Sequence, residues 1–170
     1  SSKDKSTQFE GAFVKEPLIG LHKWVASFDL NSLYPHLIMQ YNISPETLQQ
    51  ESVEKGVDHY LKNPAKESEY AVAANGSQYR KDFRGVFPSI MEDFYNQRKV
   101  AKKEMLQAQQ LYENENDPRQ LKVISSKNNY QMGMKIALNS AYGAMGNQYF
   151  RYFDLKMAEA ITSSGQLSIR

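Results

Sequence analysis

Residues 88–111 read PSIMEDFYNQRKVAKKEMLQAQQL, and this stretch decides the fold. Its apolar residues recur at the spacing of one helical face, and it contains neither glycine nor any proline after Pro88. Proline is tolerated in the first turn of a helix, so the pattern predicts one long helix from Pro88 onward. The polar run Asn114-Glu115-Asn116 predicts where this helix ends.

A second helix is predicted directly after that run. Asp117 has the chemistry of an N-cap, Pro118 suits the first turn, and Gln120 can complete a capping box. Helical spacing continues to about Tyr142, with Gly133 as a weak position. Two long helices joined by a short polar turn predict an antiparallel hairpin of roughly 35 Å that projects from the rest of the chain.

The residues on both sides of the hairpin predict short strands and further helices. Residues 23–30 (KWVASFDL) predict a buried strand that turns into a helix. Asn75-Gly76 predicts a β-hairpin between two short apolar runs. We expect a loop at residues 143–153 and then a third helix capped by Asp154. The predicted fold class is α+β.

The composition is that of a folded domain, with 170 residues of which 41% are apolar and 24% charged. A net charge of +2 is too small to indicate a nucleic-acid partner by itself. The chain has no cysteine, which excludes disulfides, thiolate metal sites and a cysteine nucleophile, and its three histidines lack the spacing of a zinc site. No apolar run is long enough to span a membrane and the polar N-terminus lacks a signal core, so we expect an intracellular protein without a membrane partner.

Polar side chains fall on one face of each predicted long helix. Arg98 and Lys102 are four residues apart in the first helix, and Lys135, Asn139 and Tyr142 follow the spacing i, i+4, i+7 in the second. Folding the hairpin about residue 115 puts Arg98 level with residue 132, about 4.5 Å along the axis from Lys135. The two faces can therefore converge on a phosphate ligand. A solvated charged helix face is the alternative, because such faces are common.

Asp29 is a second candidate functional residue. A carboxylate at the end of an apolar strand and next to a turn suits a catalytic metal ligand, although an isolated Asp there also serves as a helix cap or turn residue. The residues that follow, Ser32-Leu33-Tyr34-Pro35, place backbone N–H groups at the start of a helix, where they can bind phosphate oxygens.

Two motifs in this order carry a resemblance to a known family. Residues 29–35 (DLNSLYP) resemble the first palm motif of family B DNA polymerases, and residues 135–143 (KIALNSAYG) resemble their fingers motif. Residues 96–99 (NQRK) resemble the preceding fingers helix, and residues 11–17 (GAFVKEP) are similar to the junction with the exonuclease region in T4-type phage polymerases. The similarity extends from about Phe9 to Gln166.

The resemblance implies a division of the chain into three parts of the polymerase fold. Residues 1–87 would form an N-terminal part of the palm, with the first palm motif and a small α/β elaboration. Residues 88–142 would form the fingers as a long antiparallel helical hairpin, which would close on the nucleotide. Residues 143–170 would return into the palm.

The same resemblance implies roles for residues in the first palm motif. Asp29 would bind both Mg²⁺ ions as the catalytic carboxylate, and the Leu30 carbonyl would help hold one of them. Ser32 and Leu33 would contact the triphosphate. The ring of Tyr34 would lie under the sugar and exclude a 2′-hydroxyl. His36 departs from the serine that usually follows the Tyr-Pro pair.

In the fingers, the implied roles are nucleotide contacts. The phosphates of the incoming dNTP would be contacted by Arg98, Lys102 and Lys135. Asn139 would line the nucleotide pocket. Tyr142 and Gly143 would pack against the nascent or templating base pair.

One carboxylate is too few for two-metal phosphoryl transfer. The family's second palm motif, an Asp-Thr-Asp, would follow the fingers, but no Asp-x-Asp follows Tyr142. We therefore expect a segment of a larger polymerase, or one piece of a split enzyme, that is inactive alone. Its partners would be dNTP, primer–template DNA and the remainder of the enzyme, in the host cytoplasm if a phage encodes it. The alternative is a non-catalytic helical hairpin that grips nucleic acid by charge and stacking.

Overall fold

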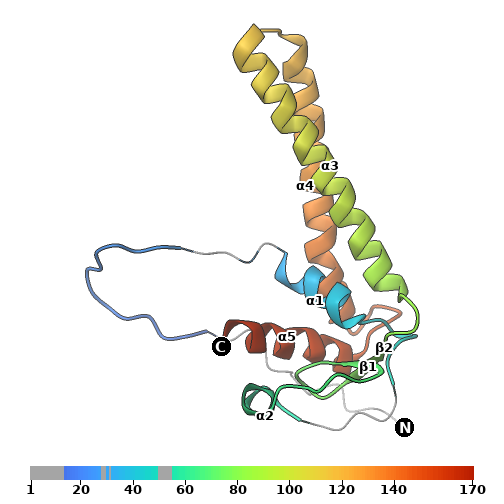
Figure 1. Ribbon diagram of the computed structural model, residues 1–170. Helices are drawn as coiled ribbons and strands as arrows, with labels where there is room; N and C mark the ends of the chain where they lie inside the picture. The colour runs from blue at the N-terminus through green and yellow to red at the C-terminus, as the bar shows by residue number, and fades with distance from the viewer. Residues whose placement is uncertain (1–13, 28–29, 31, 50–54) are drawn as a thin grey trace.

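The computed structural model describes residues 14–27, 30, 32–49 and 55–170. Five helices and two strands follow one another along these residues: α1 (Leu33–Tyr41), α2 (Val57–Lys62), β1 (Tyr70–Val72), β2 (Gln78–Arg80), α3 (Val86–Glu115), α4 (Arg119–Met145) and α5 (Leu155–Ile169). In Figure 1, α3 and α4 form a long arm that rises from a base made by α1, α5 and the small sheet. The predicted α+β class is confirmed.

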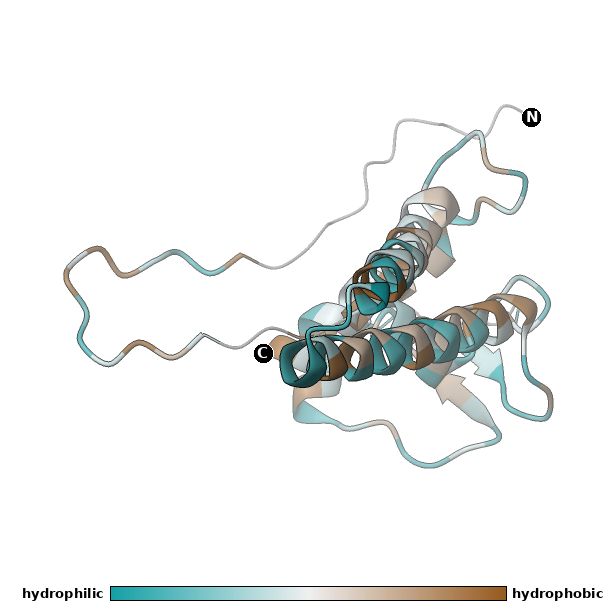
Figure 2. Ribbon diagram, turned by 90° about the horizontal axis from the view of Figure 1, so that it is seen from above, coloured by the Kyte–Doolittle hydropathy of each residue, from teal (hydrophilic) through white to brown (hydrophobic). Residues whose placement is uncertain are grey.

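The arm is the predicted helical hairpin. The 30 residues of α3 correspond to about 45 Å, and the helix ends at Glu115, as expected. Asn116 follows in the left-handed conformation, and its N–H donates to Tyr112 O at 2.9 Å. Small buried side chains, Ala101 and Ala108, let the two helices approach closely along the arm. Seen from above and coloured by hydropathy, both helices are mixtures of polar and apolar bands (Figure 2).

Polar contacts across the hairpin confirm that it folds back about residue 115. The Arg98 Nε donates to Gln131 Oε1 at 3.4 Å, and the Tyr130 hydroxyl donates to Gln97 Oε1. Nearer the tip, Lys127 Nζ lies 2.6 Å from Glu104 Oε2. The midpoints of these pairs lie at positions 113.5 to 115.5, so the hairpin folds back close to residue 115, as the sequence predicts.

The start of α4 confirms one part of the predicted capping box and corrects the other. The Asp117 carboxylate accepts a hydrogen bond from Arg119 N at 3.0 Å, which satisfies one free N–H of the helix. The Gln120 side chain donates to that carboxylate at 3.4 Å. A capping box requires it to accept from the backbone N–H of residue 117 instead, so this part of the prediction is wrong.

The end of α4 lies beyond the predicted position. The helix continues to Met145, so Gly143 lies inside it and the expected loop begins later than residue 143. Gly146 N donates to Tyr142 O at 3.1 Å and closes the last helical turn. A single glycine lowers helix propensity without ending a helix whose hydrogen bonds and packing continue.

The base is built around a core to which most elements contribute. α1 contacts α3, α4 and α5, and the buried side chains between them include large apolar groups: Ile38, Ile43, Tyr79, Met91, Leu138, Met145, Met157 and Ile161. The predicted cap of α5 is confirmed, because the Asp154 carboxylate accepts from Lys156 N and Met157 N. The predicted β-hairpin is also confirmed, with Ala71 opposite Tyr79 and Gly76 at a φ of 85°.

The predicted strand at residues 23–30 is not formed in its described part. Residues 14–27 run as an open loop away from the helices in both views (Figures 1 and 2), and Trp24 is fully exposed. A strand needs a neighbour that completes its hydrogen-bond ladder. β1 and β2 pair with each other, and no described segment pairs with residues 23–27. Asp29 lies outside the described residues.

A network of side-chain hydrogen bonds connects the end of α1 to the start of α3. Asn42, in the left-handed conformation after α1, accepts from Gly85 N at 2.9 Å through its side-chain oxygen. Its amide nitrogen donates to Arg80 O at 2.7 Å and to Phe83 O at 2.8 Å. Every polar atom of this buried side chain is therefore satisfied by backbone about 40 residues away.

Two more side chains complete this network, which we call the α1–α3 joint (Asn42, Ser44, Glu46 and Gly85). Glu46 Oε1 accepts from Val86 N at 2.5 Å, and the Ser44 hydroxyl oxygen accepts from Phe87 N at 3.3 Å. A Cβ on Gly85 would lie 2.7 Å from Ser44 Cβ. Glycine at position 85 is therefore required for the close approach of the two segments.

Replacing Asn42 by Ala should lower the free energy of unfolding by about 3 kcal/mol, because three backbone groups that meet at this buried side chain lose their partner. Urea denaturation of the 170-residue chain measures the change. Asn63→Ala is the matched control, since Asn63 makes one hydrogen bond at an exposed helix end. Equal losses for the two variants would contradict the role of Asn42.

The joint should also respond to acid. Burial opposes ionisation of Glu46, but hydrogen bonds from Val86 N–H and the Ser44 hydroxyl outweigh it and hold the pKa of Glu46 below its ordinary value of 4.5. A lowered pKa in the folded state adds stability above the unfolded-state pKa, and this stability is lost as the pH falls through the folded-state pKa. Glu46 is largely exposed, so the contribution should be no more than about 1 kcal/mol.

Unfolding free energies of wild type and Glu46→Gln, measured from pH 7 to pH 3, test this expectation. The two should differ at pH 7 and converge below about pH 4. Glu113→Gln, on the exposed surface of α3, should follow the wild type throughout. A constant gap between wild type and Glu46→Gln would show that the carboxylate charge has no part in the joint.

Candidate functional site

A cleft of about 430 Å³ lies between the start of α1 and the C-terminal half of α4. Its lining comes from two stretches that are about 100 residues apart in the sequence: Leu30, Ser32, Leu33, Tyr34, Pro35, Lys135, Asn139 and Tyr142. The structure therefore brings together most of the residues that the two motifs singled out. It does so because α1 and α4 pack on each other at the base of the arm.

The first wall of the cleft is the N-terminus of α1. Ser32 adopts the left-handed conformation with φ 56° and turns the chain into the helix. No side chain caps this end, and within the described residues the N–H groups of Leu33 and Tyr34 have no partner. Free N–H groups and the helix dipole make such an end a site for anions.

His36 stabilises this first turn, a role that the motif comparison did not predict. Its ring Nδ1 lies 2.8 Å from Ser32 O, and its backbone N–H donates to the same oxygen at 3.1 Å. A carbonyl oxygen only accepts, so Nδ1 carries the proton. The imidazole also packs edge-on against Tyr95 of α3 at 4.7 Å between ring centres. The residue that departs from the usual serine thus connects α1 to the arm.

The second wall is one face of α4. Lys135, Asn139 and Tyr142 all line the cleft, so their predicted placement on one helix face is confirmed. Lys135 and Asn139 are exposed, and Lys135 forms no ion pair within the described part of the chain. Its charge is therefore available to a ligand.

Two tyrosine rings meet at the floor of the cleft. The ring centres of Tyr34 and Tyr142 are 4.6 Å apart, with 45° between their planes. Burial, and then the neighbouring Tyr34, raise the pKa of Tyr142 above its ordinary value of 10. Tyr142 is therefore a neutral phenol at physiological pH.

Three of the predicted site residues do not line the cleft. Arg98 is directed to Gln131, Lys102 is exposed further along α3, and Gly143 lies outside the lining. The prediction that Arg98 and Lys135 would lie close together rested only on their positions along the axes of the two helices. Height does not determine the angle around each helix, and the Arg98 side chain bonds Gln131, which lies four residues before Lys135 in α4.

The described residues do not form a metal site by themselves. No three His, Asp or Glu side chains gather within residues 14–27, 30, 32–49 and 55–170. Leu30 lines the cleft and Asp29 lies outside the described residues. Among the described helices, none is long and apolar enough to cross a membrane.

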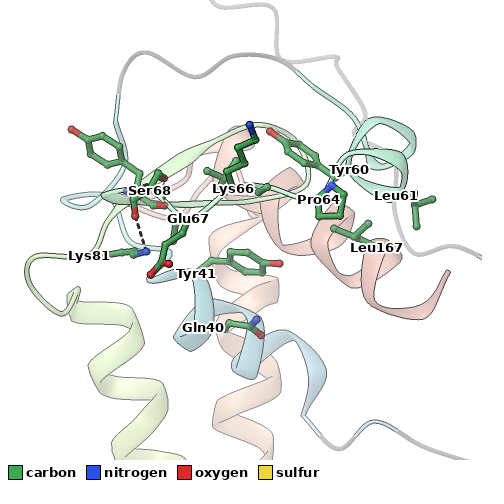
Figure 3. A pocket seen from close by; sticks show the side chains of 14 residues that line it. Gln40, Tyr41, Tyr60, Leu61, Pro64, Lys66, Glu67, Ser68, Lys81 and Leu167 are labelled. Atoms are coloured by element: carbon green, nitrogen blue, oxygen red, sulfur yellow. Dashed lines mark hydrogen bonds between the residues drawn. The ribbon is translucent and has the colours of Figure 1, made fainter.

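A second hollow, of about 540 Å³, lies between α1, α2, β1 and α5 (Figure 3). It contains Tyr41, Tyr60 and Lys66, and none of the residues that the motifs singled out. Its other lysine, Lys81, donates to Ser68 O at 2.8 Å and so has a structural partner. The hollow does not combine free charge with backbone donors as the first cleft does.

Comparison with known proteins gives a consistent result. The chain matches the family described as DNA polymerase family B over residues 1–170. It is 34% identical over 205 residues to a DNA-directed DNA polymerase of Escherichia phage RB69, which covers 95% of this chain and 23% of that protein. It is 33% identical to the corresponding protein of Enterobacteria phage T4, with the same coverage. DNA polymerase 1 of Pyrococcus abyssi is 33% identical over 159 residues, which are 93% of this chain and 18% of that protein. The chain thus spans less than a quarter of the length of these relatives.

Proposed function

Because the chain belongs to DNA polymerase family B, we propose that it is part of a DNA-directed DNA polymerase and that the cleft between α1 and α4 binds the incoming dNTP. Membership of the family confirms the resemblance that the two motifs carried. One observation carries the proposal: residues of both motifs line a single cleft, in which the described residues leave a helix N-terminus uncapped on one wall and a lysine without an ion pair on the other. Residues 1–87 and 143–170 would then belong to the palm and residues 88–142 to the fingers.

The triphosphate would lie between the two walls of the cleft. Next to Ser32, the backbone N–H groups of Leu33 and Tyr34 supply donors without a side-chain cap, and Lys135 supplies a charge that forms no ion pair among the described residues. Both features favour phosphate oxygens over a neutral ligand. Asn139 lies one turn beyond Lys135 and can donate to the nucleotide through its amide.

The sugar and the base would occupy the aromatic end of the cleft. The ring of Tyr34 would lie under the sugar, where an added 2′-hydroxyl meets the ring. Tyr142, in contact with Tyr34, would support the nascent or templating base pair together with the adjacent Gly143. Proximity of the two rings supports this arrangement, because sugar and base of one nucleotide are neighbours.

Arg98 and Lys102 would reach the phosphates when the arm closes. Both cations are on α3, which is joined to the base through the α1–α3 joint, and a movement of α3 relative to α4 would bring them toward the cleft. Lys102 is exposed and without an ion pair in the described residues, which leaves it free for such a contact. Closure of fingers around a nucleotide excludes water and completes a catalytic site.

Asp29 and the Leu30 carbonyl would be this chain's contribution to Mg²⁺ binding. Two bound Mg²⁺ ions would activate the primer 3′-hydroxyl and neutralise charge on the pyrophosphate. Further carboxylates would come from the rest of the polymerase, since Asp29 is the only acid in the first palm motif. We accordingly propose that the 170-residue chain alone does not extend a primer, and that it functions within a longer protein or with a partner chain.

Lys135→Ala in a polymerase that contains this segment should weaken dNTP binding by about 1–3 kcal/mol, the effect of one lost charged contact. The apparent dNTP affinity in single-nucleotide extension measures it. Lys122→Ala is the matched control, because Lys122 is an exposed lysine of α4 near the tip of the arm. If binding were to DNA alone, salt-dependent and indifferent to dNTP, the helical-hairpin alternative would be correct.

Asp29→Ala in the same polymerase should abolish primer extension while part of the dNTP affinity remains, because the phosphate contacts of the cleft are untouched. Rapid-quench extension and a dNTP-binding titration separate the two effects. Asp93→Ala, an exposed carboxylate of α3, should keep the wild-type rate. Near-normal extension by Asp29→Ala would remove the proposed metal ligand.

A further inference from the structure

Gly165 of α5 lies directly behind Tyr34. Gly165 is buried, and a Cβ built on it would lie 3.2 Å from Tyr34 Cε1 and 3.6 Å from Leu37 Cδ1. The first distance is shorter than an ordinary van der Waals contact between carbons. Helices α1 and α5 therefore approach so closely at this point that Tyr34 uses the space that any side chain at position 165 would need.

Other contacts of α5 hold it in place, so the helix cannot easily move away from α1. Ser164 Oγ accepts from the buried Ala74 N at 3.1 Å, and Asn75 Nδ2 donates to Lys156 O at 3.0 Å. Both bonds connect α5 to the loop between β1 and β2. Met157 and Ile161 are completely buried in the core, so a shift of the helix would disturb its packing.

The Tyr34 ring is the part that can move. Pro35, Leu37 and Ile38 are buried and hold the backbone of α1, whereas the Tyr34 side chain is only half-buried and lines the cleft. The ring also meets Tyr142, with 4.6 Å between the ring centres. A group added at Gly165 would therefore push the ring away from α5 and into the cleft.

We propose that Gly165 is a positioning residue, which sets how far the Tyr34 ring extends into the cleft and thereby how strongly the site selects deoxyribose over ribose. The inference rests on the proposed function, because it takes Tyr34 as the ring beneath the sugar. Gly165 itself touches no nucleotide. It acts because it has no side chain, which lets the ring lie back against the helix.

The test is Gly165→Ala in a polymerase that contains this segment. We expect the KM for dNTP to rise at least threefold with a smaller change in kcat, because the added methyl moves the ring and leaves the reacting groups in place. Preference for dNTP over rNTP, as the ratio of kcat/KM values, should rise at least threefold, because the larger sugar is excluded more strongly. Gly133→Ala is the matched control: it adds the same methyl to a helix where nothing lies within 4 Å, and should leave the ratio unchanged.

A double-mutant cycle with Tyr34→Ala makes the test specific to the ring. In the Tyr34→Ala background, Gly165→Ala should no longer change the ratio, because the atom that the methyl meets is gone. A ratio that falls, that rises less than threefold, or that changes equally in both backgrounds would overturn the proposal. If Gly165→Ala is too unstable to assay, Tyr34→Ala should restore its thermal midpoint, and failure to restore it would overturn the proposal too.

The cycle also distinguishes this inference from the proposed function. Absence of dNTP incorporation by the wild-type polymerase, or normal sugar selection by Tyr34→Ala, would contradict the proposed function itself. Normal incorporation and loss of selection by Tyr34→Ala, with no effect of Gly165→Ala, would contradict only the role of Gly165.

Discussion

The first backbone N–H groups of α3 depend on side chains that lie about 40 residues earlier in the chain. A helix begins with N–H groups that have no partner inside it, and a buried start without partners is strongly unfavourable. Here Asn42, Ser44 and Glu46 accept from three successive residues, from Gly85 to Phe87. This constraint joins the arm to the end of α1. Since α4 packs along α3 and α1 carries the other wall, the joint helps to place the two walls of the cleft relative to each other, together with the direct packing of α1 on α4.

The same contacts hold the arm at its base. Its helices meet through small side chains and a few polar pairs, whereas its base is held by the joint and by large buried groups such as Met91. Arg98 lies 12 residues beyond the start of α3, about 18 Å along the axis. Lys135 lies only four residues beyond Gln131, the partner of Arg98, so a rotation of the whole arm would move both cations together. In this structure Lys135 and Asn139 line the cleft, whereas Arg98 and Lys102 lie farther from the base along the arm.

Local sequence signals predicted what local interactions determine. The two arm helices, the turn at residue 115, the Asp154 cap and the Asn75-Gly76 hairpin all depend on residues within a few positions of one another.

The sequence predictions failed where contacts with residues far away in the sequence determine the structure. Residues 23–27 have strand composition but no described neighbour to pair with, and the angle of Arg98 around α3 follows from packing with α4. No sequence pattern indicated the roles of Asn42 and Gly165. Asn42 bonds backbone groups about 40 residues away, and Gly165 lies against the Tyr34 ring, and only folding brings these groups together. In the site, spacing placed Lys135, Asn139 and Tyr142 on one face, whereas the role of His36 required the structure.

The geometry of the cleft is thus determined by small residues as much as by the groups that would touch a nucleotide. Gly85 lets the joint close, Ala101 and Ala108 set the distance between the arm helices, and Gly165 sets the depth of Tyr34. A substitution at such a position adds volume where helices are in contact, so it shifts a wall or a ring without removing a hydrogen bond or a charge. Loss of Lys135 would instead remove attraction for phosphate and leave the walls in place. If the cleft binds a dNTP as proposed, a substitution at a small residue would act through the shape of the cleft, whereas loss of Lys135 would act through the charge that attracts phosphate.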